Sequence, residues 1–294
     1  MSLWSTVLAA AGWGAIWGSF ANVVAWRWPR EESLVRPGSH CPRCNHPIRW
    51  YDNVPVLSWL ALGGRCRDCR GPIDGRYALV ELTSALLAAA VWHRLASGAV
   101  ADEGVVGPGT LARFLVEFHV IWGLLTVSLV DLETLLVPDV IVLPLVVLAL
   151  AGQALLPEGR LLRNAIAAAA GYAVVHLVFV LGWRLLTGRE GMGLGDGKIL
   201  ALIGAHLGPA VLPFILVAGA VQGLLYVLVV MVVLGKSPTP PGAEEPPPER
   251  VRETKVPFGP FLALAAVEAV FLAPLVAPLV AEVRVLRVFF LAWL

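Results

Sequence analysis

The feature that most constrains this chain is the recurrence of apolar runs long enough to cross a lipid bilayer. A hydrocarbon core of about 30 Å requires roughly 20 apolar residues in a helix, and about eight such runs recur here. Hydrophobic residues make up 58% of the 294 residues and charged residues 15%, a composition outside the range of soluble globular proteins. The runs lie near residues 3–26, 77–97, 111–131, 136–156, 161–187, 196–208, 209–235 and 257–280.

The arginines that follow the first run indicate its orientation. Arg27 and Arg30 come directly after this run, and no basic residue precedes it. This order is the reverse of a cleavable signal peptide, and the positive-inside bias predicts an uncleaved span with its N-terminus outside. We therefore predict an all-α polytopic membrane protein with about eight transmembrane helices. Residues 1–26 form the first helix.

One sizeable polar segment, residues 27–76, separates the first two predicted helices. It contains nine arginines and no lysine, so the positive-inside bias predicts that it is cytoplasmic. A segment of about 50 residues is small for an independent hydrophobic core, and a metal ion can stabilise such a segment. The net charge of +1 does not indicate a nucleic-acid partner, so the expected surroundings of the chain are membrane lipid.

All four cysteines lie in this polar segment, as two CxxC pairs separated by 21 residues. Each pair can offer two thiolates to one ion, and two pairs complete a tetrahedral S4 shell typical of structural Zn2+. A reducing cytoplasm disfavours disulfides, and a shell closed by four protein ligands leaves no position for catalysis. The predicted zinc ligands are Cys41, Cys44, Cys66 and Cys69.

A second unusual segment, Gly191–Lys198, places Asp196 and Lys198 within an otherwise apolar part of the chain. A charged side chain at membrane depth is costly unless it faces the protein interior or a watery cavity, so it indicates function. Four glycines let the backbone leave helical geometry and approach another segment closely. Non-helical backbone at membrane depth occurs only where it lines a cavity. The alternative interpretation is a flexible polar loop between two spans.

Asp131, at the end of the third run, is the candidate partner of Asp196. Counting spans from the cytoplasmic polar segment predicts that both carboxylates lie at the cytoplasmic face. Asp139 is a rival, although Pro138-Asp139 is typical of a helix start, where proline and an acid are both favoured. Glu133 is a second rival and is expected to lie in an exposed loop.

Two carboxylates brought within a few ångströms cannot both ionise, so one keeps its proton while the other acts as a base. The ionised acid can activate water and the protonated acid can polarise a scissile carbonyl. This chemistry predicts an aspartic protease that needs neither a metal ion nor a covalent intermediate. The alternative from another class is a proton- or cation-coupled transporter, in which Asp131, Asp196 and Glu268 carry ions through the bundle.

The last two predicted helices are joined by residues 236–256, where prolines alternate with charged residues. This composition predicts a disordered cytoplasmic loop. The last run then opens with helix-breaking residues, Pro257-Phe258-Gly259-Pro260, which suggest backbone that lines a cavity. We assign residues 77–294 to one intramembrane peptidase domain that contains this loop.

Taken together, these motifs resemble the type IV prepilin peptidase family, the bifunctional leader peptidases and N-methyltransferases of type IV pilus and type II secretion systems. The family carries a GxGD-type intramembrane aspartic protease site. The resemblance covers nearly the whole chain. It lies in the GSFxNVxxxRxP pattern of residues 18–29, both CxxC pairs, Asp131 with Pro138-Asp139, GxGD at residues 193–196 with Lys198, and the PFGPFLAL opening of the last run.

The resemblance implies that Asp131 and Asp196 are the catalytic aspartates. The supporting residues of the catalytic loop are then Gly193, Gly195 and Lys198. It also implies that the leader of a prepilin or pseudopilin is cut after a glycine, at the cytoplasmic face of the bacterial inner membrane. The new N-terminus would be methylated with S-adenosylmethionine.

The methylation follows from the resemblance alone, because no glycine-rich nucleotide motif identifies donor-binding residues. The zinc-binding segment 27–76 is the candidate methyltransferase domain. The alternative within the same family is a peptidase that does not methylate its product.

Overall fold

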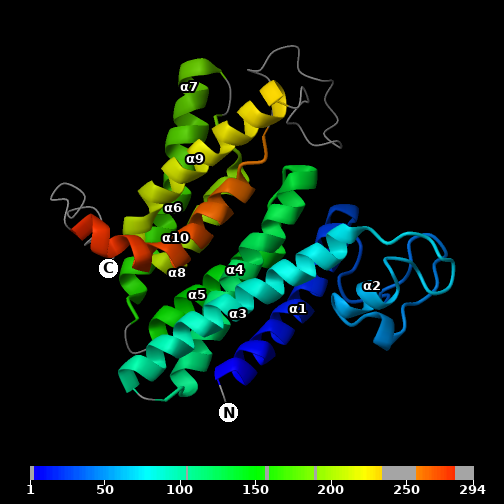
Figure 1. Ribbon diagram of the computed structural model, residues 1–294. Helices are drawn as coiled ribbons and strands as arrows, with labels where there is room; N and C mark the ends of the chain where they lie inside the picture. The colour runs from blue at the N-terminus through cyan, green and yellow to red at the C-terminus, as the bar shows by residue number, and fades with distance from the viewer. Residues whose placement is uncertain (1–2, 104, 156–158, 189–190, 234–255, 282–294) are drawn as a thin grey trace. The chain divides into compact units, whose positions relative to one another are not determined.

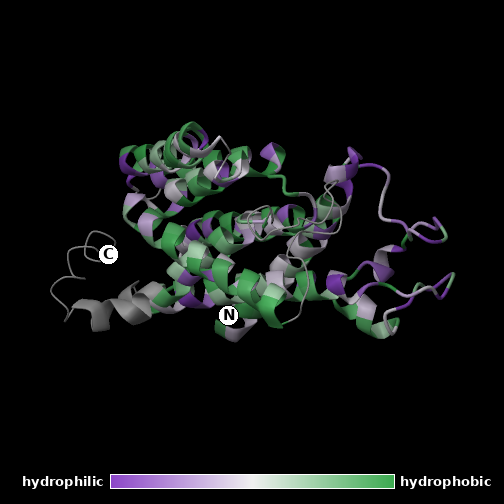
Figure 2. Cartoon of the chain, turned by 90° about the horizontal axis from the view of Figure 1, so that it is seen from above, coloured by the Kyte–Doolittle hydropathy of each residue, from purple (hydrophilic) through white to green (hydrophobic). Residues whose placement is uncertain are grey.

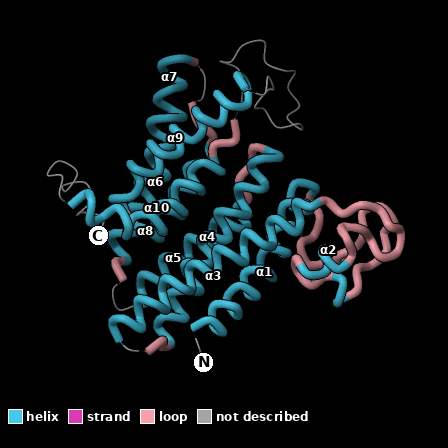
Figure 3. Tube along the Cα trace, in the orientation of Figure 1, coloured by secondary structure: helices cyan, strands magenta, loops and turns pink. Residues whose placement is uncertain are grey.

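The computed structural model describes residues 3–103, 105–155, 159–188, 191–233 and 256–281. Within these ranges the chain forms helices joined by loops and no strand (Figure 3). The only β-type pairing in the described residues is two isolated bridges. The prediction of an all-α fold is therefore confirmed. The elements are α1 (Leu3–Arg27), η1 (Trp28–Arg30), η2 (Trp50–Asp52), α2 (Leu57–Ala61), α3 (Gly75–Glu103), α4 (Pro108–Thr134), α5 (Asp139–Leu155), α6 (Leu161–Val174), η3 (Val175–Gly182), α7 (Trp183–Thr187), α8 (Leu194–Leu207), η4 (Pro209–Val211), α9 (Leu212–Leu228), η5 (Val229–Val233) and α10 (Gly259–Ala281).

Five helical stretches in the described part of the chain are long and apolar enough to cross a membrane. The protein is therefore a polytopic membrane protein, but the count of about eight transmembrane helices is not confirmed. Two apolar helices are shorter, and α8 has 14 residues, about 21 Å of helix against a hydrocarbon core of about 30 Å. The predicted disordered loop, residues 236–256, lies outside the described residues except for its last residue. The five stretches are Leu3–Arg30, Gly75–Ala101, Pro108–Thr134, Leu161–Thr187 and Pro209–Val233.

The chain divides into two compact units, Met1–Trp122 and Gly123–Leu294, with the boundary inside α4. In the first unit α1 and α3 lie side by side (Figure 1). Small residues allow this approach, because a Cβ on Gly14 would lie 2.5 Å from the Cβ of Ala88. Close packing of small residues is a common source of helix association in membranes, where the hydrophobic effect does not drive it.

The segment between α1 and α3 is mostly loop and contains only the short helices η1, η2 and α2. Figure 2 shows hydrophilic residues gathered in this segment, whereas hydrophobic residues follow the long helices. This segment contains all four cysteines.

In the second unit, α8 packs against α5, α6 and α10. Its residues Ile199, Leu200, Leu202 and Ile203 are all fully buried, as expected of a helix that is hydrophobic all round. A Cβ on Gly204 would lie 2.7 Å from the carbonyl oxygen of Ala167 in α6. A short helix surrounded in this way is fixed by its neighbours, so a residue at its N-terminus is held accurately.

Candidate active site and metal centre

Asp131 lies in the last turn of α4 and is buried. Its Oδ2 accepts a hydrogen bond of 2.9 Å from the backbone N–H of Gly259. Gly259 is the first residue of α10, and the first N–H groups of a helix have no partner within the helix. A Cβ at Gly259 would lie 2.7 Å from the same Oδ2 atom. Glycine therefore lets the backbone itself bind the Asp131 carboxylate.

Asp196 is the third residue of α8 and is also buried. Its Oδ2 accepts a hydrogen bond of 3.1 Å from the N–H of Gly193, the N-cap residue. An acidic side chain in the first turn is also favoured by the helix dipole. Asp196 is thus oriented by its own helix terminus, whereas Asp131 is oriented by a helix distant in the sequence.

The glycine before Asp196 allows a close approach between two segments. A Cβ at Gly195 would lie 2.5 Å from Cγ2 of Val137, and Val137 belongs to the short connection between α4 and α5. The start of α8 therefore packs directly on the backbone that follows Asp131. Gly195 serves this close packing at the start of a regular helix, where the sequence suggested non-helical backbone.

A Cβ at Gly259 would lie 2.7 Å from Oδ2 of Asp131 and 2.9 Å from Cδ1 of Ile199, so the fold places Asp131 close to the part of α8 that carries Asp196. The rival Asp139 is exposed at the start of α5, where its Oδ1 lies 2.5 Å from Nζ of Lys198. This ion pair links the first turn of α5 to the first turn of α8. The other rival, Glu133, is partly exposed near the end of α4.

Gly259 is a site residue that the sequence did not single out. The local signal was the PFGPF stretch, which suggested backbone lining a cavity. Its contact with Asp131 spans 128 residues, and no local pattern identifies the partner of a backbone N–H at that separation.

The four cysteines converge on one point outside the helices. Their Sγ atoms all lie within 4.8 Å of one another, and the Sγ atoms of Cys41 and Cys69 are 3.9 Å apart. A tetrahedral site with Zn–S bonds of about 2.3 Å has S···S edges of about 3.8 Å. The donor set and its spacing therefore fit a four-coordinate metal ion.

The two CxxC pairs have the same local structure. The N–H of Cys41 donates to the carbonyl of His46, and the N–H of Cys66 donates to the carbonyl of Gly71. Each turn contains a residue with positive φ at the equivalent place, Asn45 and Arg70. Two equivalent turns supply two thiols each, which is the arrangement that the spacing predicted.

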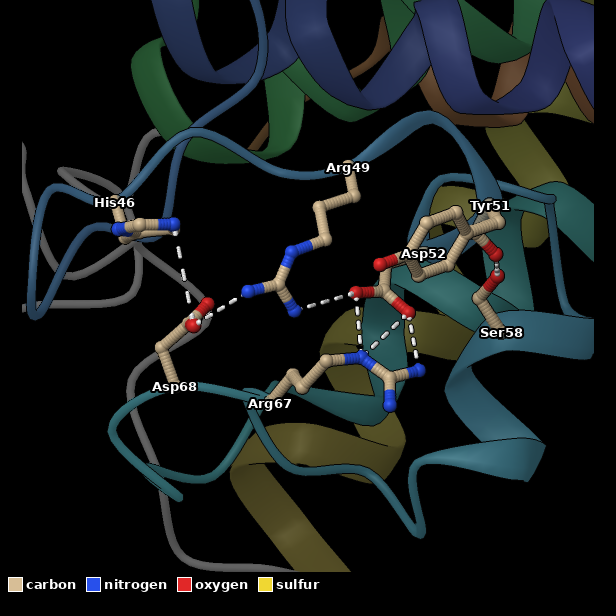
Figure 4. Close-up of polar contacts among 7 residues, drawn as sticks. All are labelled: His46, Arg49, Tyr51, Asp52, Ser58, Arg67 and Asp68. Carbon is tan, nitrogen blue, oxygen red and sulfur yellow. Dashed lines mark hydrogen bonds and ion pairs between the residues drawn. The ribbon is translucent and has the colours of Figure 1, made fainter.

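Ion pairs connect the loop between the cysteine pairs to the second pair (Figure 4). Asp52 Oδ1 lies 2.6 Å from Nη2 of Arg67, and Asp68 Oδ1 lies 3.2 Å from Nη2 of Arg49. The hydrogen bond from Arg67 lowers the pKa of the Asp52 carboxyl group. We call these four residues the arginine clasp. It fixes the loop that precedes α2.

The structure assigns no residues to S-adenosylmethionine. The described residues contain no strand and therefore no glycine-rich βα unit of the kind that holds a nucleotide.

Two family models match the chain. The model described as the Bacterial Peptidase A24 N-terminal domain matches residues 13–95, and that of the Type IV leader peptidase family matches residues 118–228. The first covers all four cysteines and the second covers both candidate aspartates.

Three similar relatives are each called prepilin leader peptidase/N-methyltransferase. The Aeromonas hydrophila protein is 39% identical over 233 residues, which cover 79% of this chain and 71% of the relative. The Pseudomonas aeruginosa protein is 37% identical over 277 residues, which cover 86% of this chain and 85% of the relative. The Stutzerimonas stutzeri protein is 36% identical over 284 residues, or 88% of each chain. No solved structure matches the chain.

Proposed function

This chain belongs to the type IV leader peptidase family, and from that premise we propose that it removes the leader of type IV prepilins or type II secretion pseudopilins. We further propose that it methylates the new N-terminus. The names of relatives at 36% to 39% identity support both activities. The observation that carries the peptidase proposal is the buried pair of Asp131 and Asp196, each bound by one backbone N–H.

In the proposed reaction the two carboxylates share one proton. The ionised carboxylate takes a proton from water, and the resulting hydroxide attacks the carbonyl carbon of the scissile bond. The protonated carboxyl group donates its proton to the carbonyl oxygen. Collapse of the gem-diol intermediate breaks the C–N bond, and the leaving amine takes a proton from the pair. One hydroxyl of the diol returns its proton to the ionised carboxylate, so that the pair again holds one proton. The cut after a glycine is carried over from the family resemblance.

The neighbouring groups orient this pair. The N–H groups of Gly259 and Gly193 each bind an Oδ2 atom, and in this proposal each Oδ1 faces the substrate. The ion pair between Lys198 and Asp139 holds the first turns of α8 and α5 together. Lys198 and Asp139 are positioning residues in this proposal and take no part in proton transfer.

The cysteine cluster would bind structural Zn2+ through Cys41, Cys44, Cys66 and Cys69. Four thiolates close the coordination shell, so the ion would stabilise the segment and would not activate water. S-adenosylmethionine would supply the methyl group to the new amine. We propose residues 27–76 as the methyltransferase domain and residues 77–294 as the peptidase domain.

We place the zinc segment and the aspartate pair at the cytoplasmic face of the bacterial inner membrane. The excess of arginine in residues 27–76 supports this orientation. A basic prepilin leader that stays in the cytoplasm would then reach the aspartate pair without crossing the membrane.

Mass spectrometry of a synthetic prepilin tests the proposal. The purified protein in lipid would be incubated with the substrate, with and without S-adenosylmethionine. We expect loss of the leader in both reactions and one added methyl group only with the donor. A cleaved product that never gains the methyl group would contradict the methyltransferase proposal. An intact substrate in both reactions would contradict the peptidase proposal.

A further inference from the structure

The short helix α2 (Leu57–Ala61) has its polar residue inside and its two leucines outside. Ser58 is 8% exposed, and its hydroxyl donates to the carbonyl of Tyr51 at 2.9 Å (Figure 4). Leu57 and Leu60 are 65% and 61% exposed, and residues three apart lie on one face of a helix. In water this arrangement would leave two leucines unburied while a hydroxyl occupies the interior.

The turn before α2 lies against the membrane helices of the first unit. The N–H of Val56 donates to Oε2 of Glu81 at 2.7 Å. Glu81 lies in α3, six residues after Gly75, which is about 9 Å along the helix. Gly18 of α1 packs against Glu81, because a Cβ there would lie 2.7 Å from Cα of Glu81.

Both of these helices are longer than the bilayer core is thick. The stretches Leu3–Arg30 and Gly75–Ala101 have 28 and 27 residues, about 40 Å of helix against a hydrocarbon core of about 30 Å. Their ends therefore extend about 5 Å beyond the core on each side. A point about 9 Å from the end of α3 then lies about 4 Å inside the edge of the hydrocarbon core, just below the boundary between headgroups and acyl chains.

Contacts on the inner side fix the direction in which the leucines point. The indole Nε1 of Trp59 donates to the carbonyl of Ile73 at 3.2 Å, and the arginine clasp holds the loop that leads to Ser58. Leu57 and Leu60 are therefore presented outward by a fixed scaffold.

The charge around α2 matches an anionic lipid surface. Residues 27–76 contain nine arginines and five acidic residues. Two of these arginines, Arg65 and Arg70, follow α2 and are exposed, whereas Arg67 is paired with Asp52. Leucine on one side with arginine near the headgroups is the composition of a helix that lies in the membrane interface.

We infer that α2 is an interfacial helix that inserts Leu57 and Leu60 at the boundary of headgroups and acyl chains, beside α1 and α3, with nearby arginines on anionic headgroups. This inference concerns a lipid-binding surface and does not depend on the proposed function. A basic prepilin leader is disfavoured as the occupant, because it would meet a surface with an excess of arginine.

Photocrosslinking of the full chain tests the occupant of this surface. Leu60→p-benzoylphenylalanine protein would be irradiated in nanodiscs of phosphatidylcholine and phosphatidylglycerol, and Arg43→p-benzoylphenylalanine, in the first cysteine turn, is the matched control. We expect at least about tenfold more phospholipid adduct at position 60 than at position 43. Adducts to another segment of the chain, to an added synthetic prepilin, or to neither would overturn the inference.

Hydrogen exchange gives a second readout that needs no bulky label. We compare wild type with Leu57→Ser/Leu60→Ser, and with Val35→Ser, which removes an exposed apolar side chain elsewhere in the same segment. We expect exchange in residues 54–62 to rise about fivefold or more in the double variant alone. We also expect slower wild-type exchange in nanodiscs that contain phosphatidylglycerol than in phosphatidylcholine alone. Equal exchange in all three proteins and both lipids would overturn the inference.

Discussion

The cysteine cluster and the aspartate pair are held in place by different kinds of interaction. The cluster lies in a loop segment whose arginine clasp is near the surface, and solvent screens such ion pairs so that they contribute little to stability. A structural zinc ion contributes about 10 to 16 kcal/mol in small zinc-binding peptides. The ion is therefore the main stabiliser that we expect for the cluster.

The aspartate pair depends on helix packing. Asp131 and Asp196 are buried, and backbone N–H groups at the starts of α10 and α8 bind them. Those helix starts are positioned by glycines that leave no room for a Cβ. We therefore expect the cluster to respond to removal of a bound metal ion, and the pair to respond to small changes in side-chain volume or charge.

The largest expected effect is on the pair itself. We expect Asp131→Asn and Asp196→Asn each to lower the rate of leader cleavage by about 10³-fold or more, because general acid–base catalysis contributes on this scale. Asparagine keeps an oxygen that can accept the backbone hydrogen bond but cannot share the proton. Cleavage rates of a synthetic prepilin measure the effect. Glu133→Gln is the control and should stay within about twofold of wild type.

A single methyl group at the start of α10 should have the next largest effect. Gly259→Ala would place a Cβ 2.7 Å from Oδ2 of Asp131, and a displacement of about 1 Å in an active site can cost about 10²-fold in rate. We expect a loss of that size at unchanged folding, measured by cleavage and circular dichroism. Gly98→Ala, where nothing lies within 4 Å of the new Cβ, should cleave normally. Normal cleavage by Gly259→Ala would contradict the claim that the aspartate pair is sensitive to a small increase in side-chain volume.

The ion pair between the helix starts should have a smaller effect. Lys198 and Asp139 are partly exposed, and such a pair contributes at most about 1 kcal/mol, or about fivefold in rate. We expect Lys198→Gln and Asp139→Asn each to slow cleavage by about three- to fivefold, and the double variant to be no slower than either. If the fold-loss in cleavage rate of the double variant equalled the product of the two single losses, the two residues would act separately.

Removal of the metal should affect cleavage least. We expect chelation to remove the ion, to speed hydrogen exchange in residues 28–74, and to abolish methylation. Cleavage should change by no more than about twofold, because a shell closed by four thiolates leaves the ion no position for catalysis. Metal content, exchange and both product masses would be measured on one sample. If chelation abolished cleavage and added Zn2+ restored it, the aspartate pair would depend on the metal ion, contrary to this expectation.

The sequence predicted the helical fold and the grouping of the cysteines well, because both depend on local patterns. Long apolar runs satisfy their own backbone hydrogen bonds as helices, and the CxxC spacing brings two thiols to one ion. The predicted number of about eight spans is not confirmed, because α8 is short and is buried by its neighbours.

Contacts between distant segments were not predictable in the same way. The N–H of Gly259 on Asp131 and the ion pair of Lys198 with Asp139 join residues 128 and 59 positions apart. The inverted burial of Ser58 also depends on the loop around it. The catalytic roles of Asp131 and Asp196 stay predictions, although the fold brings these two residues together.

The most direct test of this account is the binding of a transition-state analogue. A prepilin peptide would carry a hydroxyethylene group in place of the scissile bond, so that its hydroxyl occupies the position of the attacking water. We predict that wild type binds the analogue at least about 10²-fold more tightly than the uncleaved substrate, and that Asp131→Asn and Asp196→Asn each lose this preference. Equal affinity of the analogue for wild type and both variants would contradict the claim that these two aspartates cleave the substrate.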